Sequence, residues 1–326
     1  MSTKSAQPHL LTCARFALAF AVLPLGKGST LEPAGLAADR VATLFWVLTI
    51  GATVIWLVVV GLALYAVSAS RRPQSPRGSS LLIVGGGVIF PTVVLAGLLV
   101  WSLSMLPGLL APAPAGSLEV RVTGYQWWWR VEYLGAEGAT IELANELHLP
   151  VGEPVELQLE SHDVIHSFWV PALGGKMDMI PGRRTRLRLE PTQVGVYRGV
   201  CAEYCGTSHA LMSLVVVVEE RQAWERWLAA QAQPATSPGE ALFLEQGCGA
   251  CHTIRGTAAD GALGPDLTHV GSRASVGAGV IEADVPGLEQ WLAKTAHLKP
   301  GVLMPSFGML PPPELTALAQ YLAGLR

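Results

Sequence analysis

LEVRVTGYQWWWRVEY, residues 118–133, is the stretch that decides the fold of the central part of the chain. Apolar and polar side chains alternate along it and aromatic residues are frequent, which is typical of a strand with one buried face. Three further stretches read as short strands separated by turn residues: 153–173, 183–191 and 211–220. We therefore predict a β-sandwich or Greek-key barrel for residues 116–232.

The sequence before this domain is strongly apolar. Val41–Val67 and Ser79–Met105 contain no charged residue, and each exceeds the roughly 20 residues that cross a hydrocarbon core. A buried core helix is the alternative, but two uncharged runs of this length favour a transmembrane hairpin within residues 29–115. The loop between them carries three arginines, Arg71, Arg72 and Arg77. Such a loop faces the cytoplasm, so the later domains are predicted on the periplasmic side of a bacterial inner membrane.

Residues 1–28 are predicted to be a signal or targeting segment. Lys4 and Arg15 precede the apolar run Phe16–Leu25, which is too short to span a bilayer comfortably. An uncleaved N-terminus is the alternative. Cys13 is interpreted as an inert or discarded thiol.

Composition restricts the class of function. Charged residues make up 14% of the chain, against a usual share of about 25%, and the net charge of -3 gives no indication of nucleic-acid binding. Apart from Cys13, the cysteines form two close pairs, Cys201 with Cys205 and Cys248 with Cys251. Such spacing is a poor disulfide framework and indicates metal or cofactor binding.

The segment CAEYCGTSHALM, Cys201–Met212, gathers two thiols, an imidazole and a thioether, and His166 precedes it in DVIHSFWVP. Thiolate, imidazole and weak thioether ligands together suit copper in electron transfer, and two thiolates could bridge two metal ions. Zinc usually takes four strong ligands without a methionine. A disulfide or a buried thiol pair is the other alternative, but neither would need His209 and Met212 at these offsets.

This segment resembles the CuA motif of cytochrome c oxidase subunit II, a family with a two-helix hairpin followed by a cupredoxin domain. The resemblance implies that Cys201 and Cys205 bridge a dinuclear copper centre, with terminal imidazoles from His166 and His209 and a weak ligand in Met212. It also implies that Glu203 offers its backbone carbonyl to one copper. The Glu203 carboxylate would then approach a magnesium or manganese ion at the interface with subunit I.

GYQWWWR, residues 124–130, is similar to the aromatic segment beside CuA in that family. Trp127 aligns with the tryptophan through which electrons reach the copper, whereas Trp128 and Trp129 fit core aromatics equally well. Asp178 and Arg183 are expected to pair with each other or to contact a neighbouring subunit or haem propionates. His148 is interpreted as a surface residue.

After a linker at residues 233–239, residues 240–326 are predicted to form an all-α domain. CGACH, Cys248–His252, is a C-x-x-C-H haem attachment motif: two thioethers hold the haem, and His252 becomes an axial iron ligand. A zinc or redox C-x-x-C is the competing interpretation. The domain resembles class I c-type cytochromes, which implies a second axial methionine in LMPSFGML. We assign Met304, with Met309 as the alternative, and expect Pro265 to brace His252.

Fusion of such a domain to subunit II is the caa-type arrangement of a haem–copper oxidase. The resemblance implies a proton-translocating cytochrome-c oxidase in which this chain accepts electrons from a c-type cytochrome and passes them through haem c and CuA to subunit I. The oxygen-reducing centre would lie in subunit I, and subunit III and membrane lipid would be further partners. The alternatives are a CuA-bearing subunit of a nitric-oxide reductase and a membrane-anchored copper-delivery protein.

Overall fold

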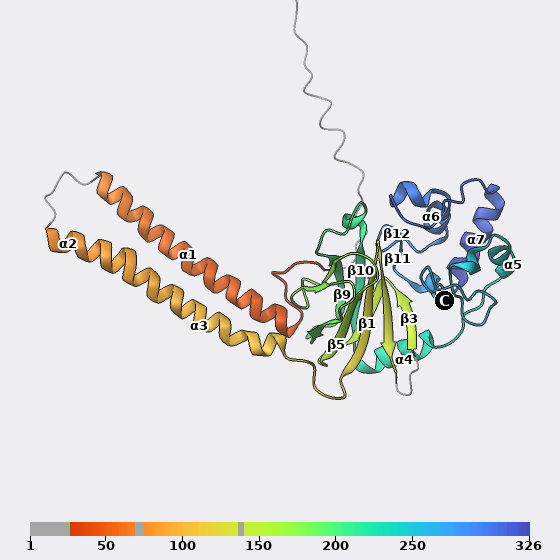
Figure 1. Ribbon diagram of the computed structural model, residues 1–326, viewed down its shortest axis with the longest axis horizontal. Coiled ribbons are helices and arrows are strands. Elements are labelled where there is room, and N and C mark those ends of the chain that lie inside the picture. The colour runs from red at the N-terminus through yellow and green to blue at the C-terminus, as the bar shows by residue number, and fades with distance from the viewer. Residues whose placement is uncertain (1–26, 69–74, 136–139) are drawn as a thin grey trace, which may run out of the picture.

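The computed structural model describes residues 27–68, 75–135 and 140–326, and these form three regions in chain order (Figure 1). A long helical hairpin extends from a β-sandwich, and a small helical domain packs on the other side of the sandwich. The predicted fold class is confirmed. Most of the predicted leader, including Cys13, lies outside the described residues, and so do Arg71 and Arg72 of the hairpin loop.

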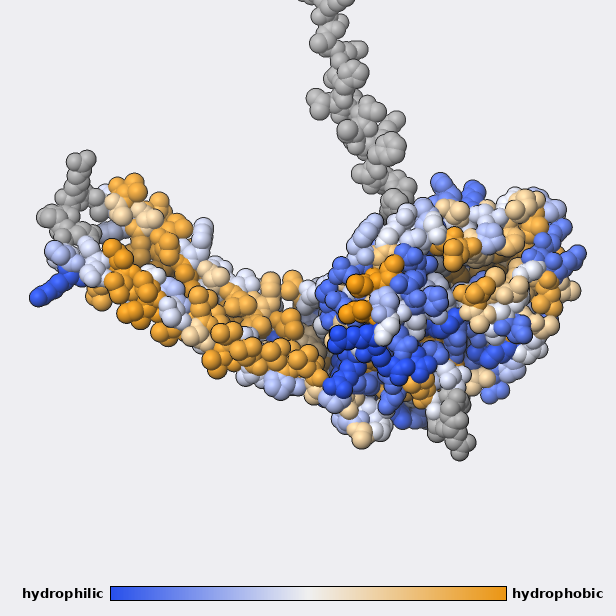
Figure 2. All heavy atoms as spheres, viewed as in Figure 1, coloured by the Kyte–Doolittle hydropathy of each residue, from blue (hydrophilic) through white to orange (hydrophobic). Residues whose placement is uncertain are grey.

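The hairpin consists of two long apolar arms. The first arm is α1 (Leu36–Ser68). The second is continuous through α2 (Pro76–Ser80), the π-helical η2 (Leu81–Ile89) and α3 (Phe90–Leu110). Both arms are long and apolar enough to cross a membrane. Their apolar side chains are exposed along almost the whole length, as the orange surface in Figure 2 shows. A bilayer would cover this surface, which water would not solvate favourably.

Two five-stranded sheets form the sandwich. The first has the order β3-β2-β1-β5-β8, and the second has the order β4-β10-β9-β6-β7. The strands of the first sheet are β1 (Leu118–Tyr125), β2 (Trp128–Leu134), β3 (Thr140–Ala144), β5 (Val155–Ser161) and β8 (Thr185–Leu189). Those of the second are β4 (Glu146–Pro150), β6 (His166–Trp169), β7 (Met177–Met179), β9 (Gly195–Cys201) and β10 (Ser213–Glu219). β1 runs parallel to β5 and β4 runs parallel to β10, whereas the other pairs are antiparallel.

Alternation along the strands builds the core between the two sheets. Alternate residues are buried from Val120 in β1 and from Val155 in β5, and Val120, Val122, Val155 and Leu157 are completely buried. Burial of each such side chain contributes about 1.5–3 kcal/mol. The backbone of Lys27 also joins the second sheet, because its N–H donates to Val196 O at 2.9 Å.

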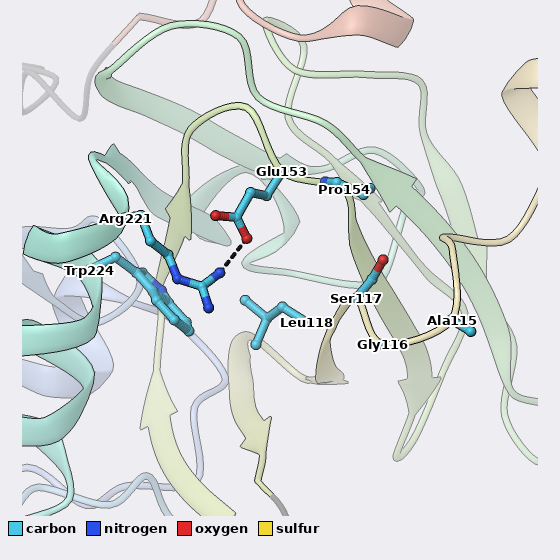
Figure 3. Close-up of a pocket in the computed structure, with 8 residues that line it drawn as sticks. All are labelled: Ala115, Gly116, Ser117, Leu118, Glu153, Pro154, Arg221 and Trp224. Atoms are coloured by element: carbon cyan, nitrogen blue, oxygen red, sulfur yellow. Dashed lines mark hydrogen bonds and ion pairs between the residues drawn. The ribbon is translucent and has the colours of Figure 1, made fainter.

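One helix covers an end of the sandwich. α4 (Arg221–Gln231) buries Trp224, whose indole N–H donates to His148 O at 3.0 Å. Beside it, Arg221 pairs with Glu153 across a shallow pocket of about 320 Å³ (Figure 3). No residue predicted to bind a metal or haem lines this pocket.

The C-terminal domain is mainly helical and has its own core. Its elements are α5 (Glu240–Glu245), η5 (Cys248–Ala250), η6 (Val270–Ser272), β11 (Ser275–Val276), β12 (Ile281–Glu282), α6 (Val285–Leu298) and α7 (Pro312–Gly324). The Asp284 side chain caps α6 by accepting from Gly287 N at 2.8 Å. The short hairpin of β11 and β12 is a departure from the predicted all-α domain, and it faces the sandwich (Figure 1).

Candidate metal and haem sites

The ends of paired strands hold the predicted copper ligands together. His166 is the first residue of β6, Cys201 is the last of β9, and these strands pair antiparallel with Phe168 opposite Cys201. The loop that connects β9 to β10, residues 202–212, is named here the copper loop. It folds back so that Cys201 N donates to Met212 O at 3.0 Å. Because β9 and β10 belong to the packed core, both ends of the copper loop are anchored.

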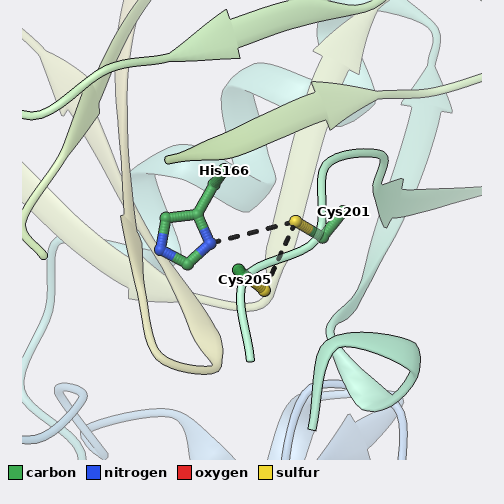
Figure 4. Close-up of side chains that lie close together, drawn as sticks. All are labelled: His166, Cys201 and Cys205. Carbon is green, nitrogen blue, oxygen red and sulfur yellow. Dashed lines mark hydrogen bonds between the residues drawn. The ribbon is translucent and has the colours of Figure 1, made fainter. Parts of the chain in front are cut away.

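The sulfur atoms and the His166 imidazole converge where the copper loop meets β6 (Figure 4). Cys201 Sγ lies 3.7 Å from Cys205 Sγ and 3.8 Å from His166 Nδ1. Cys205 Sγ lies 3.5 Å from His209 Nδ1 and 3.9 Å from Met212 Sδ. Both cysteines are free thiols and are buried, as are His166 and Met212. Two thiolates between two imidazoles, with a thioether at the edge, are a donor set that fits copper.

The two neighbouring thiols have pKa values shifted in opposite directions. A hydrogen bond from Cys205, supported by His166, lowers the pKa of Cys201, and the same pairing raises the pKa of Cys205. Burial lowers the pKa of His166, but hydrogen bonds with Cys201 and Asp163 outweigh burial, so the net pKa is raised. One thiolate therefore forms readily, and a cation would displace the remaining protons.

Asp163 is a functional residue that sequence reasoning missed. Its Oδ1 lies 2.8 Å from His166 Nε2, the ring nitrogen that faces away from the cysteines, and its Oδ2 accepts from Gln126 N at 2.7 Å. A carboxylate at this position fixes the imidazole tautomer and ring orientation. The available signal was a carboxylate three residues before a predicted metal-binding histidine.

Trp127 packs directly against the copper loop and is 6% exposed. Its indole N–H donates to Cys205 O at 3.0 Å, and the Gln126 side chain donates to the same oxygen at 2.7 Å. Trp129 is completely buried and packs its ring against Phe168 and His166, as a core aromatic does. Of these two tryptophans, Trp127 donates a hydrogen bond to the copper loop, whereas Trp129 packs in the core.

The backbone carbonyl and the side-chain carboxylate of Glu203 lie in different surroundings. Its carbonyl oxygen lies 3.3 Å from Cys201 Sγ, whereas its carboxylate lies 3.7 Å from Lys176 Nζ on the surface. Lys176 also pairs with Asp178 at 3.3 Å. The predicted Asp178–Arg183 pair is not formed among the described residues, because Lys176 and Ser167 take the Asp178 carboxylate.

The C-x-x-C-H segment forms a tight turn in the C-terminal domain. Cys248 lies in η5, Cys251 follows it, and His252 Nδ1 lies 2.8 Å from Pro265 O. This contact with Pro265 braces the ring and leaves Nε2 available as a ligand. A Cβ at Gly264 would lie 2.5 Å from His252 Cε1, so only glycine leaves room for this imidazole. Burial lowers the pKa of His252, which favours the neutral imidazole that binds a metal.

The two candidate methionines differ in burial. Met304 is partly buried against the core of the domain, as is Cys248, whereas Met309 is 77% exposed. A side chain on the protein interior is a better candidate for an axial ligand than one in solvent. This difference favours Met304.

The prediction that His148 is a surface residue is wrong. His148 is 6% exposed, stacks on Trp227 with ring centroids 3.7 Å apart, and lies between Glu146 and Glu219 at 2.8 and 2.5 Å. The helix that supplies Trp227 covers this end of the sandwich, so a residue on an outer strand position becomes buried.

Comparison with known proteins agrees with this architecture. The model of the family described as cytochrome c oxidase subunit II, periplasmic domain, matches residues 134–219, and that of cytochrome c matches residues 236–326. Cytochrome c oxidase subunit 2 of Bacillus subtilis is 32% identical over 96% of this chain and 98% of its own length. The protein of the same description from Alkalihalophilus pseudofirmus is 37% identical over 64% of this chain and 62% of its own length. The solved periplasmic domain of subunit II of Bradyrhizobium japonicum is 30% identical, with a TM-score of 0.34, over 36% of this chain and 96% of that one.

Two apolar helices, a cupredoxin-like domain with a sulfur and imidazole cluster, and a cytochrome c domain define a membrane-anchored electron-transfer protein. The chain belongs to the cytochrome c oxidase subunit II family and carries a fused C-terminal cytochrome c domain. Copper of the CuA kind and haem are the cofactors that its two domains imply.

Proposed function

We propose that this chain is the electron-accepting subunit of a terminal cytochrome c oxidase. It takes electrons from a c-type cytochrome and passes them through its own haem c and a dinuclear CuA centre to subunit I. There oxygen is reduced to water and protons are pumped. The observation that carries the proposal is the buried cluster of Cys201, Cys205, His166, His209 and Met212 beside a C-x-x-C-H domain.

The copper would be held by those five side chains and by the carbonyl of Glu203. When bound, a copper pair supplies a one-electron relay. The contribution of the protein is rigidity, because the ligands are attached to strands of a packed core and little has to move when the charge changes. Asp163 contributes by keeping the His166 ring oriented.

The haem would be held by thioethers from Cys248 and Cys251 and by axial ligands from His252 and Met304. A thioether axial ligand raises the reduction potential relative to a second imidazole. Such a potential suits electron delivery toward oxygen. The Pro265 carbonyl can only accept a hydrogen bond, so it favours the His252 tautomer with a proton on Nδ1, which would leave Nε2 free to bind the iron.

Trp127 is the proposed route by which electrons reach the copper. Its indole hydrogen-bonds the carbonyl of Cys205, and it is covered by the haem domain and not by solvent. An external cytochrome would therefore meet the haem domain first. Tethering both centres in one chain raises their effective concentration to about the mM range.

The proposed setting is a bacterial inner membrane with both cofactor domains on the periplasmic side. The helical hairpin would contact lipid, subunit I and subunit III. The exposed carboxylate of Glu203, beside Lys176 and Asp178, would face subunit I and approach a magnesium or manganese ion there.

Purification of the full chain with copper and haem supplied tests the proposal. Two copper ions, one covalent haem and a multi-line EPR spectrum of a mixed-valence copper pair are expected. A single exchangeable copper would instead indicate copper delivery, and a colourless chain that holds zinc would overturn the proposal. Turnover of oxygen against nitric oxide by the co-purified complex separates an oxidase from a nitric-oxide reductase.

A further inference from the structure

The haem domain contacts the copper domain through a lysine with unusual burial. Lys299 is 2% exposed, although lysine is almost never fully buried without partners. Its Nζ donates to three backbone carbonyl oxygens: Trp127 O at 2.7 Å, Leu211 O at 2.8 Å and Gly277 O at 2.5 Å. An ammonium has three N–H donors and no acceptor, so every donor has a partner.

The three carbonyls come from three different segments. Trp127 lies in the turn between β1 and β2, and Leu211 lies in the copper loop next to Met212. Gly277 lies in the haem domain, in the turn between β11 and β12. Burial lowers the pKa of Lys299 to about 7, so at pH 6 the side chain carries its full set of donors. One side chain thus ties the haem domain to both copper-domain segments.

The haem-domain turn has a backbone shaped for this contact. Gly277, Ala278 and Gly279 all have positive φ, at 68°, 62° and 87°. Positive φ is unfavourable for alanine, yet Ala278 is 1% exposed and its carbonyl accepts from Ser213 N at 3.0 Å. Ser213 is the first residue of β10 and follows Met212. This bond joins the two domains directly beside the copper loop.

The backbone at Gly301, two residues after Lys299, packs against the Trp127 ring. A Cβ at Gly301 would lie 2.7 Å from Trp127 Cη2, so the absence of a side chain lets the haem-domain backbone contact the indole. On the copper side, a Cβ at Gly206 would lie 3.0 Å from Trp127 Cζ2. The indole is therefore enclosed between the two domains. Ser208 adds a further bond between them by donating to Pro300 O at 2.7 Å.

We infer that Lys299 is a positioning residue that holds the haem domain in one fixed orientation on Trp127 and the copper loop. Its consequence for electron transfer rests on the proposed function. An electron that the haem loses and the copper pair gains would then cross a packed contact between the two domains. It does not wait for a tethered domain to diffuse into place.

Hydrogen exchange on the full chain in detergent at pH 6 tests this inference. In Lys299→Met, the Ser213 amide is expected to exchange about tenfold faster, because a charged hydrogen-bond donor is lost from a buried site. The Gly271 amide, which donates to Leu325 O within the haem domain, should be unchanged. Lys294→Met removes the same charge from the exposed face of α6 and is the matched control, with no change at Ser213.

Two outcomes overturn the inference. Unchanged exchange at Ser213 would show that Lys299 does not hold the domains together. Equal acceleration at Ser213 and Gly271 would show that Lys299 maintains the fold of the haem domain and not its position. If Lys299→Met fails to mature, Lys299→Gln carries the test, because its neutral amide cannot supply all three donors. A smaller acceleration at Ser213, of about threefold, is then expected, and the same two outcomes overturn the inference.

Haem and copper are counted on the same samples. A chain without either cofactor overturns the proposed function, while its Ser213 exchange still reports on the position of the domain. In the loaded chain, Lys299→Met should also slow electron equilibration between the two centres, and Lys294→Met should not.

Discussion

Replacement of Asp163 by asparagine should weaken copper binding without removing any copper ligand. Asp163 Oδ1 lies 2.8 Å from His166 Nε2, and Oδ2 accepts from Gln126 N at 2.7 Å. Asparagine has one acceptor oxygen and one NH2 group. Either His166 or the Gln126 amide therefore loses its acceptor, and the negative charge beside the imidazole is lost in both cases.

The expected magnitude follows from these two contacts. Loss of one hydrogen bond to a charged group costs about 1.5–3 kcal/mol. Mutation of a group that orients a metal ligand typically lowers metal affinity by about 10–100-fold, or about 1.4–2.7 kcal/mol. Both routes predict a copper affinity weaker by at least about tenfold. The geometry of the site in the remaining loaded fraction should be preserved.

Competition with a chelator, followed by the EPR spectrum and the visible band of the copper pair, measures this effect. Glu160→Gln is the matched control, because Glu160 lies three residues upstream and pairs with Arg184 on the surface. Haem content should be the same in both variants. An Asp163→Asn chain that holds copper as tightly as the native chain would refute the assigned role of Asp163.

Three further changes have defined outcomes. Cys205→Ser should abolish the copper spectrum, since a bridging thiolate is lost, while covalent haem remains, and retention of the spectrum would contradict the bridging role. Met304→Leu should leave haem attached but lower its reduction potential markedly, whereas an unchanged redox titration would move the assignment to Met309. Trp129→Ala should destabilise the sandwich by about 3–5 kcal/mol in denaturant unfolding, because its side chain is completely buried, and a change below about 1 kcal/mol would place it outside the essential core.

Much of the fold could be predicted from local pattern. α1 after Arg40 and the whole of α3 contain no charged residue, and such long uncharged runs predict helices that cross a membrane. The alternation in residues 118–133 appears in the structure as the regular burial of β1 and β2. The π-helical segment η2 was not predicted, since hydropathy does not distinguish it from an α-helix.

The sequence predicted a site where its candidate ligands lie close together along the chain. Cys201, Cys205, His209 and Met212 lie on one short loop, so their spacing alone indicated a metal. Asp163 lies only three residues before His166, but a lone carboxylate at that offset is not a motif. Lys299 acts through contacts with residues far away in the sequence, so no local pattern marks it. His148 was misplaced for the same reason, because a helix distant in sequence covers it.

The sequence by itself determined the two apolar helices, the sandwich, the C-x-x-C-H segment and the candidate metal ligands, since each depends on residue types within a short stretch. Only the tertiary structure decided how the two cofactor domains meet. The Lys299 ammonium gathers carbonyls from residues 127, 211 and 277. Backbone carbonyls are present in every residue, so no pattern of side chains could show which of them would converge on one buried charge.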